Sequence, residues 1–188
     1  MSTAAPTAPH GHGHPSAGAP AKPVDRAKIR EAIDANPSQM TVMLARQLGV
    51  PEVEVIRSFP EDKVNELDIT KWEDIIRSFE QLGSVHVIST NAAVTLEVYG
   101  TFGNFSMTGP YFNVQSKTLD MHIRHGGLKA VFAVQKPGHM DGVNTLSFQF
   151  FDERGMAAFK VFLTFGGDAP PAEKVEAFTA LRDKFKMV

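Results

Sequence analysis

The feature that most constrains the fold is a change of hydrophobic period at Val85. From there to Leu163, apolar residues no longer recur at helical spacing but alternate with polar ones, as in half-buried β-strands. The alternating segments are residues 85–90, 94–99, 111–114, 119–124, 129–135, 145–151 and 157–163. Short sequences rich in Gly, Pro, Asn and Asp separate them, so successive strands have room to pair only antiparallel. The pattern predicts a large, mainly antiparallel β-sheet, with the nearly all-apolar residues 129–135 as a central strand covered on both faces.

Helical patterns flank the predicted sheet on both sides. Residues 25–35, 40–59 and 70–82 carry apolar side chains at helical spacing, and residues 172–186 form a final amphipathic segment. Helices at both ends and a sheet between them predict an α+β domain with an N-terminal helical cap and a C-terminal helix.

Two helices within residues 40–59, joined by a turn at Gly49, match a helix-turn-helix pattern. Glu52 and Glu54 occupy the turn that would enter a major groove, where carboxylates repel phosphates. The net charge of −2 gives no further reason to expect nucleic acid. We interpret this pair as a packing cap and expect no nucleic-acid partner.

Residues 1–23 consist mainly of Ala, Pro, Gly, His and Ser without periodicity, which predicts a disordered tail before a single domain at residues 24–188. Within the tail, His10, His12 and His14 alternate with glycine. This segment is either a loose site for zinc, nickel or copper or a solvated tail.

Cysteine is absent from the chain, which excludes disulfides, thiolate metal sites and cysteine nucleophiles. No apolar run approaches the roughly 18 residues that a membrane helix needs, so no membrane insertion is expected. The N-terminus shows no basic and apolar regions of a secretory signal. These features fit a cytoplasmic protein.

The outward face of the predicted sheet is not plainly polar. Alternation in residues 119–124 turns His122 and Arg124 away from the core, and alternation in the last two strands exposes Phe151, Lys160 and Phe162. If these strands share a face, it combines imidazole, cations and aromatic rings. Either an apolar ligand or a helix or second subunit covers such a face. Haem needs this combination: an imidazole for iron, apolar walls for the macrocycle, and cations for the propionates.

Between about Met40 and Lys184, the chain resembles the bacterial haem-utilisation carriers of the ChuX/HutX group. No single match is specific, but the order and spacing of the matches are. The matching residues are Thr41-Val42, Leu44-Ala45, Gly49-Val-Pro51, Glu54-Val-Ile-Arg57, Trp72, Gly83, Val85, Glu97, Gly100, Tyr111-Phe-Asn-Val114, His122-Ile123, Phe150-Phe-Asp152 with Gly155, and Phe159-Lys-Val-Phe162.

The resemblance implies an intracellular, homodimeric haem-binding protein. Such a carrier takes haem from an importer and passes it to a haem-degrading or storage protein. The alternative is an enzyme that degrades haem itself, as larger relatives can. His122 stands at the family's His-Ile position and is the expected iron ligand. Arg124 and Lys160 are expected to pair with the propionates, with Phe162 as an apolar wall and Tyr111 as a further contact.

This sequence departs from the family pattern at several positions. Thr90 stands where some members have a second histidine, and Met121 replaces the glycine that usually precedes His-Ile. Residues 165–168 replace an Arg-Asp pair. A second axial ligand, if present, is therefore open among Tyr111, His86, Met121 and a residue of a partner subunit. Strand alternation turns Met121 away from His122.

Overall fold

Strands fill the region where the sequence pattern changes, as predicted. The computed structural model describes residues 24–91 and 93–187; the predicted tail, with its three histidines, lies outside them. Strands β2 (Val85–Thr90), β3 (Thr95–Gly100), β5 (Tyr111–Gln115), β6 (Asp120–Arg124), β7 (Ala130–Pro137), β8 (Asn144–Phe151) and β9 (Ala157–Thr164) match the seven segments. Two short strands, β1 (Val64–Leu67) and β4 (Ser106–Thr108), were not predicted.

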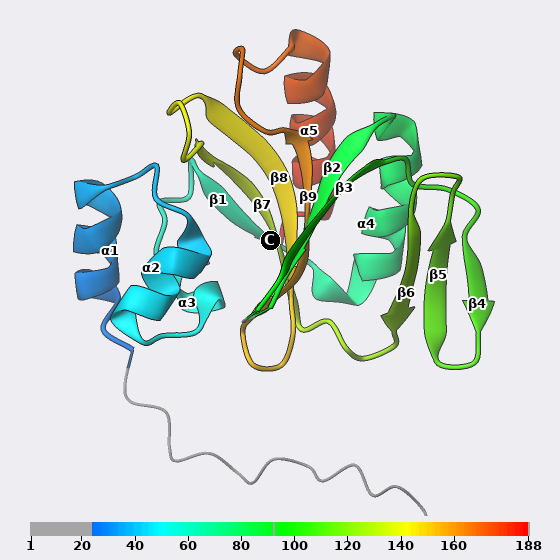
Figure 1. Cartoon of the computed structure of the whole chain (residues 1–188), viewed down its shortest axis with the longest axis horizontal. Coiled ribbons are helices and arrows are strands. Elements are labelled where there is room, and N and C mark those ends of the chain that lie inside the picture. Colours follow the sequence, from blue (N-terminus) through cyan, green and yellow to red (C-terminus); the bar gives the residue numbers. More distant parts are fainter. Residues whose placement is uncertain (1–23, 92, 188) are drawn as a thin grey trace, which may run out of the picture.

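The strands form two antiparallel sheets. The larger has the order β1-β7-β8-β9-β2-β3, and the smaller has the order β4-β5-β6 (Figure 1). Strand β7 lies between β1 and β8 and is buried on both faces, which confirms its predicted central position. Separation of β5 and β6 from the larger sheet was not predicted, and it decides where the candidate site residues lie.

The helices α4 and α5 pack on the larger sheet and form the main core with it. The 3-10 turns η1 (Ile69–Lys71) and η2 (Phe79–Leu82) flank α4 (Trp72–Ser78), and α5 (Ala172–Phe185) is the last element. Ile75 of α4 and Phe178 of α5 pack with Phe148 of β8 in the main core. Phe112 of β5 joins the same core, which attaches the smaller sheet.

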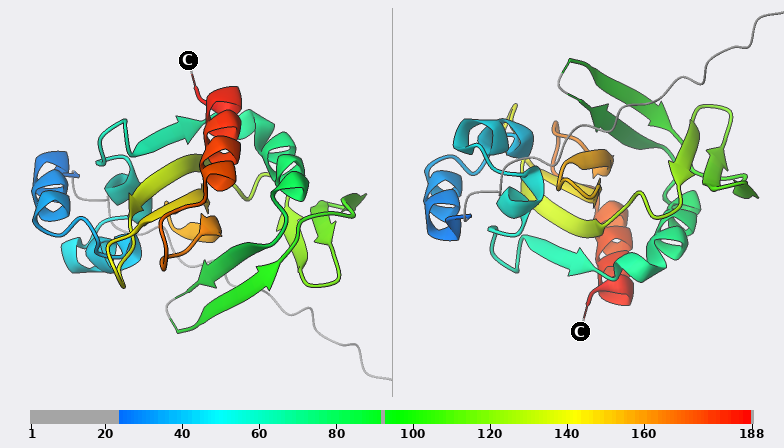
Figure 2. Two further views of the ribbon diagram at one scale, coloured as in Figure 1. Left: turned by 90° about the horizontal axis from the view of Figure 1, so that it is seen from above. Right: turned by 90° about the horizontal axis from the view of Figure 1, so that it is seen from below.

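The N-terminal cap consists of α1 (Arg26–Ala35), α2 (Thr41–Leu48) and α3 (Glu52–Ile56), at the opposite end of the molecule from the smaller sheet (Figures 1 and 2). Val53 and Ile56 of α3 pack on Phe132 and Phe151 in a second core cluster. Phe151 is therefore covered by a helix, which was one of the two alternatives that the sequence left open for this face. Gly49 ends α2 with φ +68°, a left-handed conformation that glycine adopts without strain.

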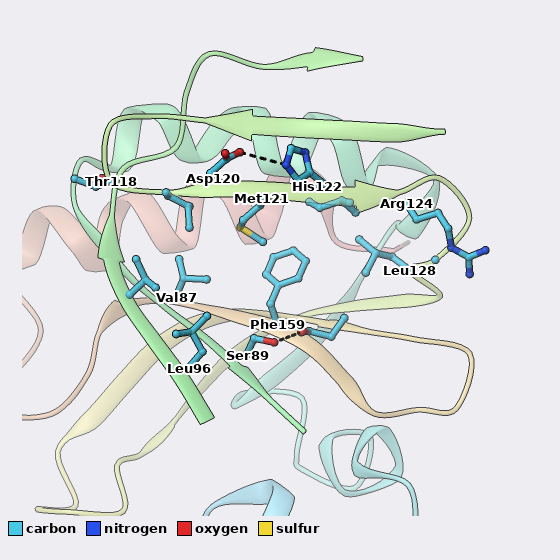
Figure 3. A pocket seen from close by; sticks show the side chains of 15 residues that line it. Val87, Ser89, Leu96, Thr118, Asp120, Met121, His122, Arg124, Leu128 and Phe159 are labelled. Atoms are coloured by element: carbon cyan, nitrogen blue, oxygen red, sulfur yellow. Dashed lines mark hydrogen bonds and ion pairs between the residues drawn. The ribbon is translucent and has the colours of Figure 1, made fainter. Parts of the chain in front are cut away.

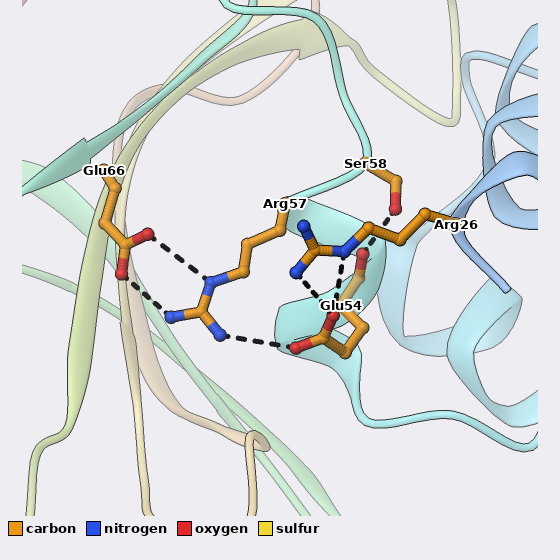
Figure 4. Close-up of polar contacts among 5 residues, drawn as sticks. All are labelled: Arg26, Glu54, Arg57, Ser58 and Glu66. Atoms are coloured by element: carbon orange, nitrogen blue, oxygen red, sulfur yellow. Dashed lines mark hydrogen bonds and ion pairs between the residues drawn. The ribbon is translucent and has the colours of Figure 1, made fainter. Parts of the chain in front are cut away.

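Ion pairs join this cap to the edge of the sheet. Glu54 pairs with Arg26 of α1 at 3.1 Å and with Arg57 at 3.3 Å, and Arg57 also pairs with Glu66 of β1 at 2.9 Å (Figure 4). Glu54, one of the two carboxylates that argued against DNA binding, therefore links the cap to Arg57, which pairs with strand β1. No helix in the described part of the chain is long and apolar enough to cross a membrane.

Candidate functional site

His122 lies in the middle of β6, on the exposed face of the smaller sheet. The predicted alternation is confirmed, since Ile123 is buried and His122 is exposed. Strand β5 pairs with β6 so that Asn113 stands opposite His122 and Tyr111 opposite Arg124. These four side chains share one face of the sheet, because directly paired residues point the same way. The structure therefore brings Tyr111, His122 and Arg124 together, as predicted.

A hydrogen bond to the amide oxygen of Asn113 orients the imidazole of His122. His122 Nδ1 lies 2.8 Å from Asn113 Oδ1. The Asn113 amide nitrogen donates to the hydroxyls of Ser106 and Thr108, each at 3.1 Å, and the Ser106 hydroxyl donates to Gln115 at 3.4 Å. An amide oxygen only accepts hydrogen bonds, so His122 Nδ1 carries the proton and Nε2 keeps its lone pair. A hydrogen bond from Nδ1 to a protein oxygen is common for a histidine that binds a metal through Nε2.

Asp120 lies on the same face of β6 as His122. Its Oδ1 is 3.6 Å from His122 Nε2, and both side chains are more than half exposed.

A groove of about 460 Å³ opens beside β6, and we call it the His122 groove. Its walls come from β2, β3 and β6, and Phe159 and Leu128 contribute to its apolar lining. Figure 3 shows Met121 pointing toward Phe159, whereas the imidazole of His122 and the carboxylate of Asp120 project from the other side of β6. His122 therefore stands at the rim of this groove, and its ring does not enter it.

Lys160 and Phe162 lie on the opposite face of the larger sheet. Phe159 of β9 lines the His122 groove, while Lys160 and Phe162 line a second groove of about 850 Å³ beneath the N-terminal cap, which we call the Lys160 groove. The prediction that they share a face with His122 and Arg124 is wrong. It assumed a single sheet, but β6 belongs to a separate sheet that packs beside the inner face of β9.

The charge of Lys160 is already compensated. Its ammonium group donates to the buried carboxylate of Glu52 at 2.5 Å and to the Thr41 hydroxyl at 3.2 Å. Thr41 also donates to Glu52 at 2.6 Å. This network ties the cap to the sheet, so the primary role of Lys160 in this chain is structural.

His86 was one candidate for a second axial ligand, and its surroundings do not favour that role. Its ring is buried, stacks on Tyr99 at 4.3 Å between centroids, and meets Phe165 edge-on at 4.4 Å. Its Nε2 lies 2.9 Å from Glu97 Oε2. Its neighbour Phe162 places it on the face of the Lys160 groove, away from His122.

The sequence patterns did not predict two residues of functional interest, Asn113 and Lys136. Asn113 lies two residues after Tyr111 in the same strand, so alternation could have placed it beside His122 had β5 and β6 been recognised as a hairpin pair. Lys136 follows the apolar run of β7 and is buried in the Lys160 groove. A lysine at a strand end usually reaches solvent, so its sequence position carried no signal.

Comparisons with known proteins agree with this architecture. A model of the haem utilisation ChuX/HutX family matches residues 65–181. The intracellular heme transport protein HutX of Vibrio cholerae is 26% identical over 164 residues, covering 85% of this chain and 83% of HutX.

Two solved structures show how the fold recurs. A protein from Erwinia carotovora aligns with a TM-score of 0.76 at 23% identity, covering 84% of this chain and 98% of that protein. Apo-PhuS, a heme-binding protein from Pseudomonas aeruginosa, aligns with a TM-score of 0.70 at 21% identity, covering 93% of this chain but 52% of PhuS. At these identities, the structural matches establish the fold. The family model covers more than half of the 188 residues, and the chain belongs to the haem utilisation ChuX/HutX family.

Proposed function

We propose that this protein carries haem inside the cell, taking it from an importer and passing it to a haem-degrading or storage protein. Its relative HutX is named an intracellular heme transport protein, and the two chains align over most of both lengths. In this proposal, His122 binds the iron, and the molecule works in the cytoplasm.

The observation that carries the proposal is the exposed imidazole of His122, oriented through its Nδ1 by Asn113. Asn113 holds the proton on Nδ1, so the lone pair of Nε2 points away from the sheet toward an incoming ligand. The imidazole side chain is 57% exposed. Haem iron bound there would be accessible to a second protein without any opening of the fold.

Exposure favours transport over degradation. An enzyme that opens the macrocycle benefits from a closed site that excludes water and side reactions. A carrier instead needs reversible binding, because tight enclosure slows release. His122 stands on an open face at the rim of a groove, which suits transfer of intact haem.

Arg124 and Tyr111 complete the proposed site. Both side chains are exposed and lie directly opposite each other on β6 and β5, next to His122. The Arg124 guanidinium can pair with a propionate, and the Tyr111 ring and hydroxyl can contact the macrocycle or its edge. Lys160 and Phe162 are left out of this site, because the larger sheet separates them from His122.

We further propose that a second copy of the chain covers the haem. The described residues border only one side of a macrocycle bound at His122, and edge strand β3 exposes Leu96 by 59% and Tyr99 by 70%. Exposed apolar side chains on a free strand edge favour association. PhuS, about twice the length of the matched region, is consistent with a unit that works in pairs. Residues 24–188 would form the single domain of each copy.

A haemin titration followed by absorbance tests the proposal. His122→Ala should abolish or shift the Soret band of the wild-type complex. His125→Ala is the matched control, because this half-exposed histidine follows β6 but engages Glu73 at 2.8 Å. An unchanged spectrum for His122→Ala removes His122 from its role. If the wild-type complex loses its Soret band to an open-chain product after addition of a reductant, the protein is a degrading enzyme.

A further inference from the structure

We propose that a groove between α4 and α5 is a docking site for an extended acidic segment of a partner protein. We call it the α4–α5 groove, and its volume is about 770 Å³. Its walls come from η1, α4, η2 and the end of α5, which lies beside α4 (Figure 2). This inference goes beyond the proposed function and uses no residue of the haem site.

Three exposed cations line the α4–α5 groove: Lys71, Arg77 and Lys184. Among the described residues, none of the three lies within 4.0 Å of a carboxylate oxygen. Asp74 is the one acidic residue of the lining, so the groove has an excess of two positive charges. Unpaired cations that surround one depression attract an anionic partner and guide its approach.

Aromatic rings hold two of these cations in place. The Arg77 guanidinium lies over the rings of Phe105 and Phe112, at 5.3 and 5.0 Å from their centroids. The Lys184 ammonium group lies 4.9 Å from the ring centroid of Phe185. Such contacts use the face of a guanidinium and leave its N–H edges free to bind carboxylates. Side chains that are already held lose less conformational entropy when a partner binds.

The helix dipole accounts for some of the charges in the groove but not for Lys71. Arg77 and Lys184 lie in the last turns of their helices, where cations are favoured, and Asp74 lies in the first turn of α4, where a carboxylate is favoured. Lys71 is the N-cap residue of α4, where the dipole disfavours a cation. An acidic partner in the groove would stabilise Lys71.

Acidic side chains close to the groove are engaged elsewhere. Asp68 accepts hydrogen bonds from the backbone and hydroxyl of Thr70, and these bonds lower the pKa of Asp68. Glu73 lies 2.8 Å from His125, and Asp183 lies 2.8 Å from Arg182. The cations of the groove are therefore left for an external partner.

The length of the groove sets the length of the segment that fits it. Lys71, Asp74, Ser78 and Gln81 follow one another at intervals of three and four residues, so they lie along one side of the helical segment. Ten helical steps span about 15 Å. An extended chain advances about 3.3 Å per residue, so about five residues fit along this side.

A protein segment suits the groove better than a nucleic acid. Single-stranded nucleic acids stack their bases on exposed aromatic rings, but Phe112 and Phe185 beneath the cations are buried. The net charge of −2 also opposes a long polyanion. Helix α4 packs on the buried face of the smaller sheet, where Trp72 meets Phe112 at 5.4 Å between ring centroids. A partner in the groove therefore leaves His122, on the exposed face, accessible.

A rhodamine-labelled peptide of about five glutamates is a suitable probe. Its binding to the full-length protein is followed by fluorescence polarisation at low ionic strength, where exposed charges are least screened. The double variant Lys71→Met/Lys184→Met should weaken binding about fivefold or more. Asp74→Asn should strengthen binding about twofold, because the groove loses its own carboxylate. A purely structural role of these side chains would not produce opposite effects.

Matched controls separate this groove from general charge attraction. Lys28→Met/Lys117→Met removes two exposed lysines outside the groove, with the same change in net charge, and should leave peptide binding unchanged. A glutamine peptide of equal length should bind about tenfold more weakly. Haemin binding by Lys71→Met/Lys184→Met, read from the Soret band, should match the wild type, so this inference and the proposed function can fail independently.

Three results would overturn the inference. One is equal weakening by the two double variants, and another is equal binding of the glutamate and glutamine peptides. The third is an oligothymidylate that binds more tightly than the glutamate peptide and is equally sensitive to Lys71→Met/Lys184→Met, because the groove would then take a polyphosphate chain.

Discussion

The substitution Asn113→Leu removes the amide that orients His122 while keeping a side chain of similar volume in the buried position. Asn113 is 3% exposed, and its Oδ1 accepts the Nδ1 proton of His122 at 2.8 Å. Without this acceptor, the ring is free to rotate and to place its proton on either nitrogen. Haem affinity should therefore fall, although His122 itself is intact.

The expected loss of affinity is about 10–100-fold, the usual effect of removing the hydrogen-bond partner that orients a metal-binding histidine. This corresponds to about 1.4–2.7 kcal/mol of binding free energy. The free energy of unfolding should fall by less, about 1–2 kcal/mol, because leucine fills the space that Asn113 leaves. Water can also reach the two hydroxyls that lose their donor, since Thr108 is exposed and Ser106 is half-buried.

A double-mutant cycle with His122→Ala separates orientation from other effects. Haem affinity is measured for the wild type, Asn113→Leu, His122→Ala and the double variant, each first checked for folding by circular dichroism. If Asn113 acts through His122, its substitution changes nothing in the His122→Ala background. Asn113→Asp keeps the acceptor and should retain binding. A loss of equal size in both backgrounds would refute the reasoning.

Two further predictions concern charges around the Lys160 groove. Lys160→Met should destabilise the fold by about 3–5 kcal/mol in chemical denaturation, because Glu52 stays buried without its cation, and adding Glu52→Gln should recover most of the loss. Lys136→Met should raise the free energy of unfolding by about 3 kcal/mol at neutral pH. Burial and the nearby charge of Lys160 lower the pKa of Lys136 from its ordinary value of 10.5 to about 8, so this gain is complete below pH 8 and disappears as pH rises from 8 to 10.5; a pH-independent gain would contradict it.

The sequence predicted the fold well because its signals are local. Alternation and turn residues located seven of the strands, and helical spacing located the cap and the last helix. The short strands β1 and β4 were missed, because four and three residues carry too little alternation to stand out.

The site was predicted only in part because strand alternation assigns a face within one sheet and says nothing about which strands share a sheet. It correctly turned His122 and Arg124 away from the core. It also grouped them with Lys160 and Phe162, which lie across the larger sheet. The partner of Lys160 is Glu52, 108 residues earlier in the chain, and no local pattern reveals a contact at that distance.

Release of haem to a stronger acceptor tests the central claim most directly. Protein loaded with one equivalent of haemin is mixed with excess apomyoglobin, and the Soret band is followed with and without a reductant. Intact haem should move to myoglobin under both conditions, and faster from His122→Ala than from the wild type. Haem that stays bound, or that is converted to an open-chain product before it reaches myoglobin, would contradict a carrier that holds its cargo through an exposed His122.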